Sequence, residues 1–206
     1  MLGGEEGRRL LMTRSAQGGF NLIEIMVSLT VLAILISLGA PSFGEWLQNQ
    51  QIRAATEAIV NGMQVARGEA IKRNLAVQLT LDPPTAGWTV CEATKQPCDS
   101  TLLADPVKVQ DVIQNRSGQE GTRNANVKPT PDGAIAVTFS PLGSVMIKNS
   151  DGTSPLTQVD VVNTQGDCMA AGGTRRCLRV VVTGGGSIRM CDPTPGIVAP
   201  DTRACP

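Results

Sequence analysis

The sequence SAQGGFNLIEIMVSLTVLAILISLGA, residues 15–40, decides the architecture of this chain. It begins with small and polar residues, reaches two glycines and an aromatic residue, and continues as an apolar run with Glu24 near its start. A carboxylate at membrane depth costs roughly 2.5 to 3.5 kcal/mol on insertion scales. Glu24 therefore needs a partner or a function that compensates for this cost.

The apolar run is long enough to cross a bilayer. No formal charge occurs from Ile25 to Gly44, and a helix of about 20 residues spans the hydrocarbon core. Arg8, Arg9 and Arg14 precede the run, and basic residues favour the cytoplasmic side. We expect a single-pass segment, with the C-terminal part of the chain outside the cytoplasm.

Two simpler interpretations of this segment fit less well. A secretory signal peptide ends in small residues at its cleavage site, whereas bulky Leu38 stands shortly before the candidate site at Ala40 and Pro41 follows it directly. A plain signal anchor accounts for the apolar run but leaves the glycine-aromatic junction and Glu24 unexplained.

The composition disfavours an enzyme. The 206 residues contain no histidine, which removes the commonest general base and the usual catalytic zinc ligands. A membrane-anchored periplasmic enzyme would need a carboxylate or serine-lysine site, and the sequence offers no clear one. Basic and acidic residues both number 18, so no net charge attracts nucleic acid. The acidic residues are scattered, and we expect no cofactor and no metal site.

The cysteines indicate an oxidising compartment. No CxxC spacing occurs, and an even number of cysteines after an apolar segment is typical of a disulfide framework. Pairing between neighbours along the chain is the simplest connectivity, although the sequence alone leaves the other connectivities open. The six residues are Cys91, Cys98, Cys168, Cys177, Cys191 and Cys205.

The remaining pattern predicts an α+β fold, with one long helix packed on an antiparallel β-domain. Pro41 should kink or loosen the helix. In residues 45–74 the apolar residues recur at steps of mostly three and four, which is typical of a helix with one buried face. These residues are Leu47, Ile52, Ala55, Ile59, Met63, Ala66 and Ala70.

Asn74 is expected to close the helix, and residues 75–206 to form the β-domain. Alternating apolar residues and turn signals predict strands or hairpins. They lie at 75–81, 87–91, 105–114, 134–148, 156–163, 176–183 and 185–191, with loops at 115–133 and 149–154.

The N-terminal pattern resembles the class III signal sequence of type IV pilins and type II secretion pseudopilins. The residues that carry the resemblance are Gly18, Gly19, Phe20, Leu22, Ile23 and Glu24. It implies that a prepilin peptidase cuts after Gly19 and that Phe20 is then N-methylated. Asn21 departs from the family pattern, in which a hydroxyl residue usually follows the aromatic one.

The resemblance also implies a domain order and a set of partners. Residues 1–19 would be the cleaved leader, 20–44 the transmembrane and assembly helix, 45–74 its amphipathic half, and 75–206 the periplasmic domain. Glu24 would pair with the N-terminal amine of a neighbouring subunit during filament assembly. The implied partners are the peptidase, other major and minor pilins and the inner membrane, from which the chain would pass into the pilus.

The order of the elements, with "TFSPLGS" midway and "LRVVVTGGGSIRMCDP" late, resembles the GspH/FimT branch of minor pilins. This branch implies a subunit that primes or joins pilus assembly at the tip. A minor pseudopilin of type II secretion is the alternative. Some relatives bind DNA through a late arginine-rich motif, and the candidates here are Arg175, Arg176, Arg179 and Arg189. The motif is incomplete at Gly186-Ser187-Ile188-Arg189, so DNA binding is a further alternative that the sequence does not favour.

Overall fold

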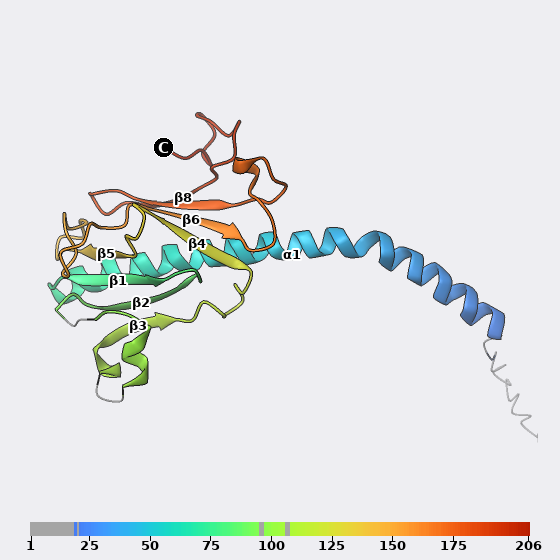
Figure 1. Ribbon diagram of the computed structural model, residues 1–206, viewed down its shortest axis with the longest axis horizontal. Coiled ribbons are helices and arrows are strands. Elements are labelled where there is room, and N and C mark those ends of the chain that lie inside the picture. Colours follow the sequence, from blue (N-terminus) through green and yellow to red (C-terminus); the bar gives the residue numbers. More distant parts are fainter. Residues whose placement is uncertain (1–18, 20, 95–96, 106–107) are drawn as a thin grey trace, which may run out of the picture. The chain divides into compact units, whose positions relative to one another are not determined.

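The computed structural model describes residues 19, 21–94, 97–105 and 108–206. The chain divides into two compact units, Met1–Pro41 and Ser42–Pro206. A single long helix, α1 (Leu22–Arg73), contains residues of both units. All the strands of the described residues belong to the second unit, and Figure 1 shows them in chain order from green to red.

The end of α1 is defined by its backbone hydrogen bonds. Asn74 adopts a left-handed conformation with φ 54°. Its N–H donates to the carbonyl of Ile71, and the N–H of Leu75 donates to the carbonyl of Ala70, both at 3.3 Å. This pair of bonds is the Schellman motif, for which asparagine is the best residue after glycine. The prediction that Asn74 closes the helix is confirmed.

In the part of the chain that the structure describes, eight strands form two antiparallel sheets, which confirms the expected α+β fold. The first sheet has the order β3-β2-β1-β5 and the second has the order β4-β6-β7-β8. The strands of the first sheet are β1 (Val77–Asp82), β2 (Gly87–Glu92), β3 (Val112–Arg116) and β5 (Ala136–Phe139). Those of the second are β4 (Ala125–Thr130), β6 (Gln158–Asn163), β7 (Leu178–Val182) and β8 (Ile188–Cys191).

One hydrophobic core joins the second part of α1 to both sheets. Six of the seven residues predicted for the buried face of the helix lie in this core, whereas Leu47 is 45% exposed. The helix approaches the first sheet closely at Gly62, where an added Cβ would lie 2.7 Å from a ring carbon of Trp88. This glycine is required because the indole ring fills the space that a side chain would take.

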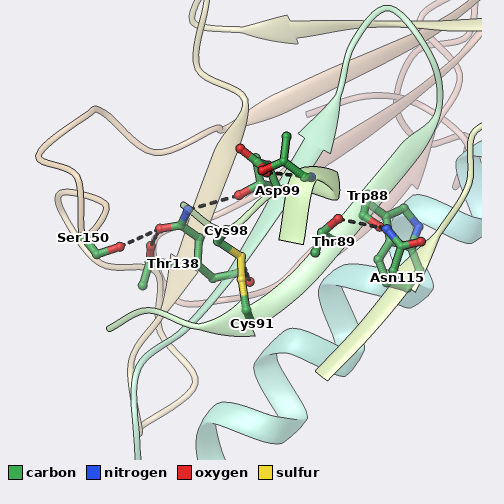
Figure 2. Close-up of a disulfide and its surroundings, with 11 residues drawn as sticks. Trp88, Thr89, Cys91, Cys98, Asp99, Asn115, Thr138 and Ser150 are labelled. Carbon is green, nitrogen blue, oxygen red and sulfur yellow. Dashed lines mark hydrogen bonds between the residues drawn. A yellow bond between two sulfur atoms is a disulfide. The ribbon is translucent and has the colours of Figure 1, made fainter. Parts of the chain in front are cut away.

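The other face of the first sheet carries buried polar side chains that are hydrogen-bonded to one another and to Ser150. Gln78 accepts hydrogen bonds from Thr138 at 3.2 Å and from Ser150 at 2.8 Å, and Cys91 is bonded to Cys98 beside them (Figure 2). Gln78 and Thr138 are both buried. Burial of these polar groups is tolerable because each is hydrogen-bonded.

Two strand predictions were wrong in detail. In 105–114 a short 3₁₀ helix, Val109–Asp111, precedes β3, which begins only at Val112. The loop predicted at 115–133 contains strand β4. The sequence of β4, ANVKPT, has only two buried apolar residues, Ala125 and Val127. Its proline is tolerated because β4 lies at a sheet edge.

Candidate functional site

The residues predicted for processing and assembly lie at the start of α1. Phe20 and the leader up to Gly18 lie outside the described residues, and Gly19 is exposed. Glu24 occupies the first turn of the helix and is exposed. Its N–H donates to the carbonyl of Asn21 at 3.0 Å. Within the described residues its carboxylate has no hydrogen-bond or ion-pair partner.

The first part of α1 exposes almost all of its apolar side chains. Between Leu22, 74% exposed, and Ile36, 59% exposed, no large apolar residue is less than 47% exposed. Among the described residues, no helix has the length and apolarity needed to cross a membrane. The membrane-spanning segment expected within 20–44 therefore stays a prediction.

Pro41 lies within the helical range of α1. Its side chain lies outside the described part of the structure. The kink expected there stays a prediction.

The cysteines pair as neighbours along the chain. The three disulfides join Cys91 to Cys98, Cys168 to Cys177 and Cys191 to Cys205, with sequence separations of 7, 9 and 14 residues. Each closes a local loop. The last one holds the C-terminal tail, residues 192–206, against β8, where Asp192 and Ala204 form an isolated bridge.

The four candidate arginines do not converge on one surface. Arg175 is largely buried, and its Nη1 lies 3.7 Å from Oε1 of Glu45 on α1. Arg179 makes a bidentate contact to Asp160, with nitrogen–oxygen distances of 2.5 and 3.0 Å. Arg189 is exposed on β8, and no ion pair to it occurs in the described part of the chain. A strip of phosphate-binding cations is therefore not formed by these four residues.

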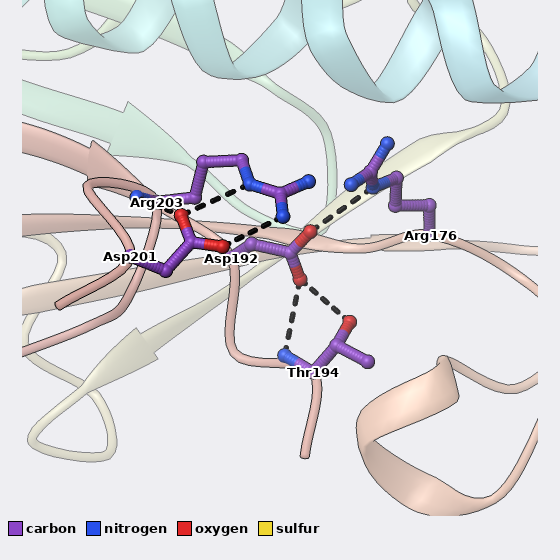
Figure 3. A network of polar contacts seen from close by, with 5 residues as sticks. All are labelled: Arg176, Asp192, Thr194, Asp201 and Arg203. Atoms are coloured by element: carbon purple, nitrogen blue, oxygen red, sulfur yellow. Dashed lines mark hydrogen bonds and ion pairs between the residues drawn. The ribbon is translucent and has the colours of Figure 1, made fainter. Parts of the chain in front are cut away.

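Arg176 belongs to a separate network around Asp192 (Figure 3). The Asp192 side chain is 3% exposed and accepts from Nε of Arg176 at 3.0 Å. It also accepts from the N–H and hydroxyl of Thr194, at 3.0 and 2.6 Å. Burial acts to raise the pKa of Asp192, but the Thr194 and Arg176 contacts outweigh it and hold the pKa below its ordinary value.

A second carboxylate of the tail is bound by its own arginine. Asp201 accepts from Nε and Nη2 of Arg203 at 3.1 and 2.7 Å. The Arg203 contact lowers the pKa of Asp201 to about 2. In Figure 3 the guanidinium groups of Arg176 and Arg203 flank Asp192, and the ribbon of α1 passes above them.

Arg176, Asp192 and Arg203 border a pocket of about 410 Å³ within the second unit. The pocket lies between α1, the strands β7 and β8, and the C-terminal tail. Its lining residues are Asn49, Gln50, Arg53, Arg176, Leu178, Met190, Cys191, Asp192, Thr202 and Arg203. We refer to it below as the tail pocket.

Sequence reasoning identified only part of this pocket. It selected Arg176 as a candidate, yet it did not associate Arg53 or Arg203 with any site. These residues meet because the tail returns to β8, where it is held by the Cys191–Cys205 disulfide and by the hydrogen bond from the Asp192 N–H to the Arg203 carbonyl. The sequence contained one signal for this pocket. If Cys205 is assumed to pair with Cys191 at the end of β8, the tail must lie near that strand.

Comparison with known proteins identifies the family. The model of the family described as "Type II transport protein GspH" matches residues 55–186. The crystal structure of the Pseudomonas aeruginosa (strain PAO1) type IV minor pilin FimU in space group P21 has 16% identity and a TM-score of 0.46. The alignment covers 70% of this chain and 91% of that chain. For the same protein in space group P65 the identity is 15% and the TM-score 0.42, with 67% and 90% covered.

The family match spans more than half of the chain, from the buried face of α1 to the turn before β8. It includes both sheets apart from β8 itself. It confirms the family expected from the N-terminal motif and the order of the elements. The chain belongs to the GspH family.

Proposed function

We propose that this protein is a minor type IV pilin, a non-enzymatic subunit that primes or joins pilus assembly at the filament tip. A prepilin peptidase cleaves it after Gly19, Phe20 is N-methylated, and the chain waits in the inner membrane with its β-domain in the periplasm. The observation that carries this proposal is the continuous exposure of apolar side chains from Leu22 to Ile36. Such a surface needs a lipid or protein environment.

Glu24 supports the same function. Its carboxylate lies in the first turn of α1 without a described partner, and cleavage after Gly19 would create a cationic amine four residues before it. Within one chain, both groups lie near the positive end of the helix dipole, where the carboxylate is favoured and the amine is not. Pairing between the amine of one subunit and Glu24 of the next satisfies both charges in an apolar filament interior.

A second candidate is a minor pseudopilin of type II secretion. The description of the matching family, which names type II transport, favours it. The same processing and the same Glu24 pairing would serve that machine. The two functions are distinguished by deleting the pilus assembly ATPase and the secretion ATPase in turn. The deletion that abolishes assembly of this protein identifies the machine that it serves.

DNA binding is a weaker alternative for the arginines. Arg175, Arg176 and Arg179 each face a carboxylate, namely Glu45, Asp192 and Asp160. If DNA uptake were the function, salt-sensitive binding would be lost when Arg189 is replaced together with Arg175 and Arg176. Undiminished binding by that triple variant would exclude this role for the arginines.

The experiment that tests the proposal is the intact mass and N-terminal residue of the protein, expressed with and without a prepilin peptidase. We expect a chain that starts at N-methylated Phe20 only when the peptidase is present. Gly19→Ala is the matched variant, because it changes the cleavage site and no described contact of the β-domain. A leader that stays in place with active peptidase, or cleavage near Ala40, would contradict the proposal.

A further inference from the structure

We propose that the tail pocket binds an extended peptide segment of a neighbouring subunit, one that carries a carboxylate beside an apolar side chain. That the partner is a filament subunit rests on the function proposed above. The affinity of the pocket for a peptide rests only on its own lining residues.

The arginines of the pocket have unused hydrogen-bond donors. Arg53 contacts Glu57 through Nε at 2.8 Å, and Arg176 contacts Asp192 through Nε at 3.0 Å. No other hydrogen bond from these two side chains occurs among the described residues. Each guanidinium has five N–H donors, so the terminal nitrogens of both residues remain available. A ligand that supplies acceptors, such as carboxylate or carbonyl oxygens, would satisfy them.

The charge balance favours a peptide over a polyanion. Arg53, Arg176 and Arg203 are matched by Glu57, Asp192 and Asp201. A phosphate polymer binds mainly through an excess of cations and the release of its counterions, and this pocket has no such excess. Individual acceptor atoms can still bind to the unused donors, because such contacts depend on local geometry.

The rest of the lining matches the other parts of a peptide. Leu178 and Met190 are apolar residues of β7 and β8 that line the pocket, and Met190 is 38% exposed. An apolar side chain of the ligand can pack on these two residues. The pocket thus offers hydrogen-bond donors and an apolar surface.

The position of β8 gives an extended segment access to the pocket. β8 is an edge strand that pairs only with β7 among the described strands. The tail lies along its end at Asp192 but not along Ile188 to Met190, where no bridge to the tail is formed in the described residues. An unpaired edge can accept a further strand. A segment that binds in the pocket could therefore continue along β8.

The test is a titration of the full-length chain in detergent with three short peptides, acetyl-Leu-Asp-methylamide, acetyl-Leu-Asn-methylamide and acetyl-Gly-Asp-methylamide. Arginine labelled with ¹⁵N reports on the Nε–H resonances of Arg53, Arg176 and Arg203. We expect saturable shifts of these resonances with the first peptide. Binding of the other two should be about tenfold weaker or more, because each lacks either the charge or the apolar side chain.

Variants connect the shifts to the pocket. Arg53 and Arg203 have exposed side chains and form the rim of the pocket. The rim variants Arg53→Gln and Arg203→Gln each remove a charged hydrogen-bond donor and should weaken binding of the first peptide about tenfold. Arg176→Gln tests the same point but also removes a partner of buried Asp192, so the two rim variants carry the conclusion. Arg123→Gln is the matched control, since Arg123 is exposed just before β4, at the opposite edge of the sheet from β8, and does not line the pocket.

The outcomes are distinct. Absence of saturable shifts, or equal binding by wild type and both rim variants, would overturn the proposal. Stronger shifts with a ten-residue oligothymidylate than with the first peptide would also overturn it, in favour of a polyanion site. Peptide binding is measured on the isolated chain, so its failure leaves prepilin processing and filament entry standing. Conversely, an unprocessed leader would contradict the pilin function and leave the peptide site intact.

Discussion

The two parts of α1 both carry apolar side chains, but they bury very different shares of them. From Leu22 to Ile36 the large apolar side chains are exposed, whereas from Ile52 to Ala70 the apolar stripe is almost completely buried. The difference lies in the pattern. The first part is apolar on all sides, and the second has one stripe of mostly small residues that fits against the sheets. Among the described residues, none covers the apolar side chains of the first part.

The largest expected effect contrasts one isoleucine from each part. Ile59 is fully buried and Ile34 is 59% exposed. Ile59→Ala should lower the free energy of unfolding of the β-domain by about 2 to 5 kcal/mol, because it leaves a cavity in the core. Ile34→Ala should change it by less than about 0.5 kcal/mol. Urea unfolding of the full chain in detergent, followed by near-UV circular dichroism, measures both values. Equal losses would mean that the two parts of the helix are not energetically distinct.

Two glycines sharpen the contrast within the second part of the helix. Gly62→Ala should lower the free energy of unfolding by about 1 to 3 kcal/mol, because the new methyl group overlaps the ring of Trp88. Gly68→Ala meets no atom within 4 Å and should raise the free energy of unfolding by about 0.5 to 1 kcal/mol through helix propensity. The same unfolding measurement applies. A stabilising Gly62→Ala would show that the helix can move away from the sheet at little cost.

Two carboxylates give a third comparison. Asp192→Asn removes a charge that Arg176 and Thr194 bind in a buried position, and should cost about 1 to 3 kcal/mol of unfolding free energy. Glu24→Gln should leave the unfolding free energy unchanged, since no described group binds that carboxylate, yet it should reduce recovery of the protein in sheared filaments. Wild-type filament recovery of Glu24→Gln would remove Glu24 from the assembly proposal.

The smallest effect is a dependence of stability on pH. The pKa of Asp192 lies below its ordinary value, and that of Asp201 is lowered to about 2. A carboxyl group whose pKa is lower in the folded state stabilises the fold above its unfolded pKa, about 4, and loses this contribution as pH falls through its folded pKa. The melting temperature should therefore fall by a few degrees between about pH 4 and pH 2. Asp192→Asn should reduce this fall, and an unchanged profile in that variant would contradict the assignment.

Much of the fold could be predicted because its signals are local. The buried stripe of α1 follows from spacing, and the helix end at Asn74 follows from the tendency of asparagine to adopt a left-handed conformation. Strand β4 was missed because its asparagine, lysine and proline are typical of loops, and only pairing with β6 makes it a strand. Edge strands need fewer apolar residues than central ones, so their sequence signal is weaker.

The candidate site was less predictable for a related reason. The arginines named as candidates for an unfavoured DNA-binding alternative do not act together: neighbours such as Arg175 and Arg176 contact different elements, Glu45 on α1 and Asp192 in the tail. The tail pocket instead combines a helix residue, Arg53, with Arg203 near the end of the chain. Such long-range contacts depend on the tertiary fold, and no spacing rule predicts them.

The consecutive pairing of the cysteines has a kinetic consequence. When a chain enters an oxidising compartment in the order of its sequence, each new thiol meets the thiols that entered before it. Each disulfide of this chain joins two cysteines that are consecutive in the sequence. If oxidation keeps pace with entry, the second cysteine of each pair therefore arrives when its native partner is the only earlier thiol still reduced. Oxidation in order of appearance then yields the native pairs directly, so the protein should mature without an enzyme that rearranges disulfides.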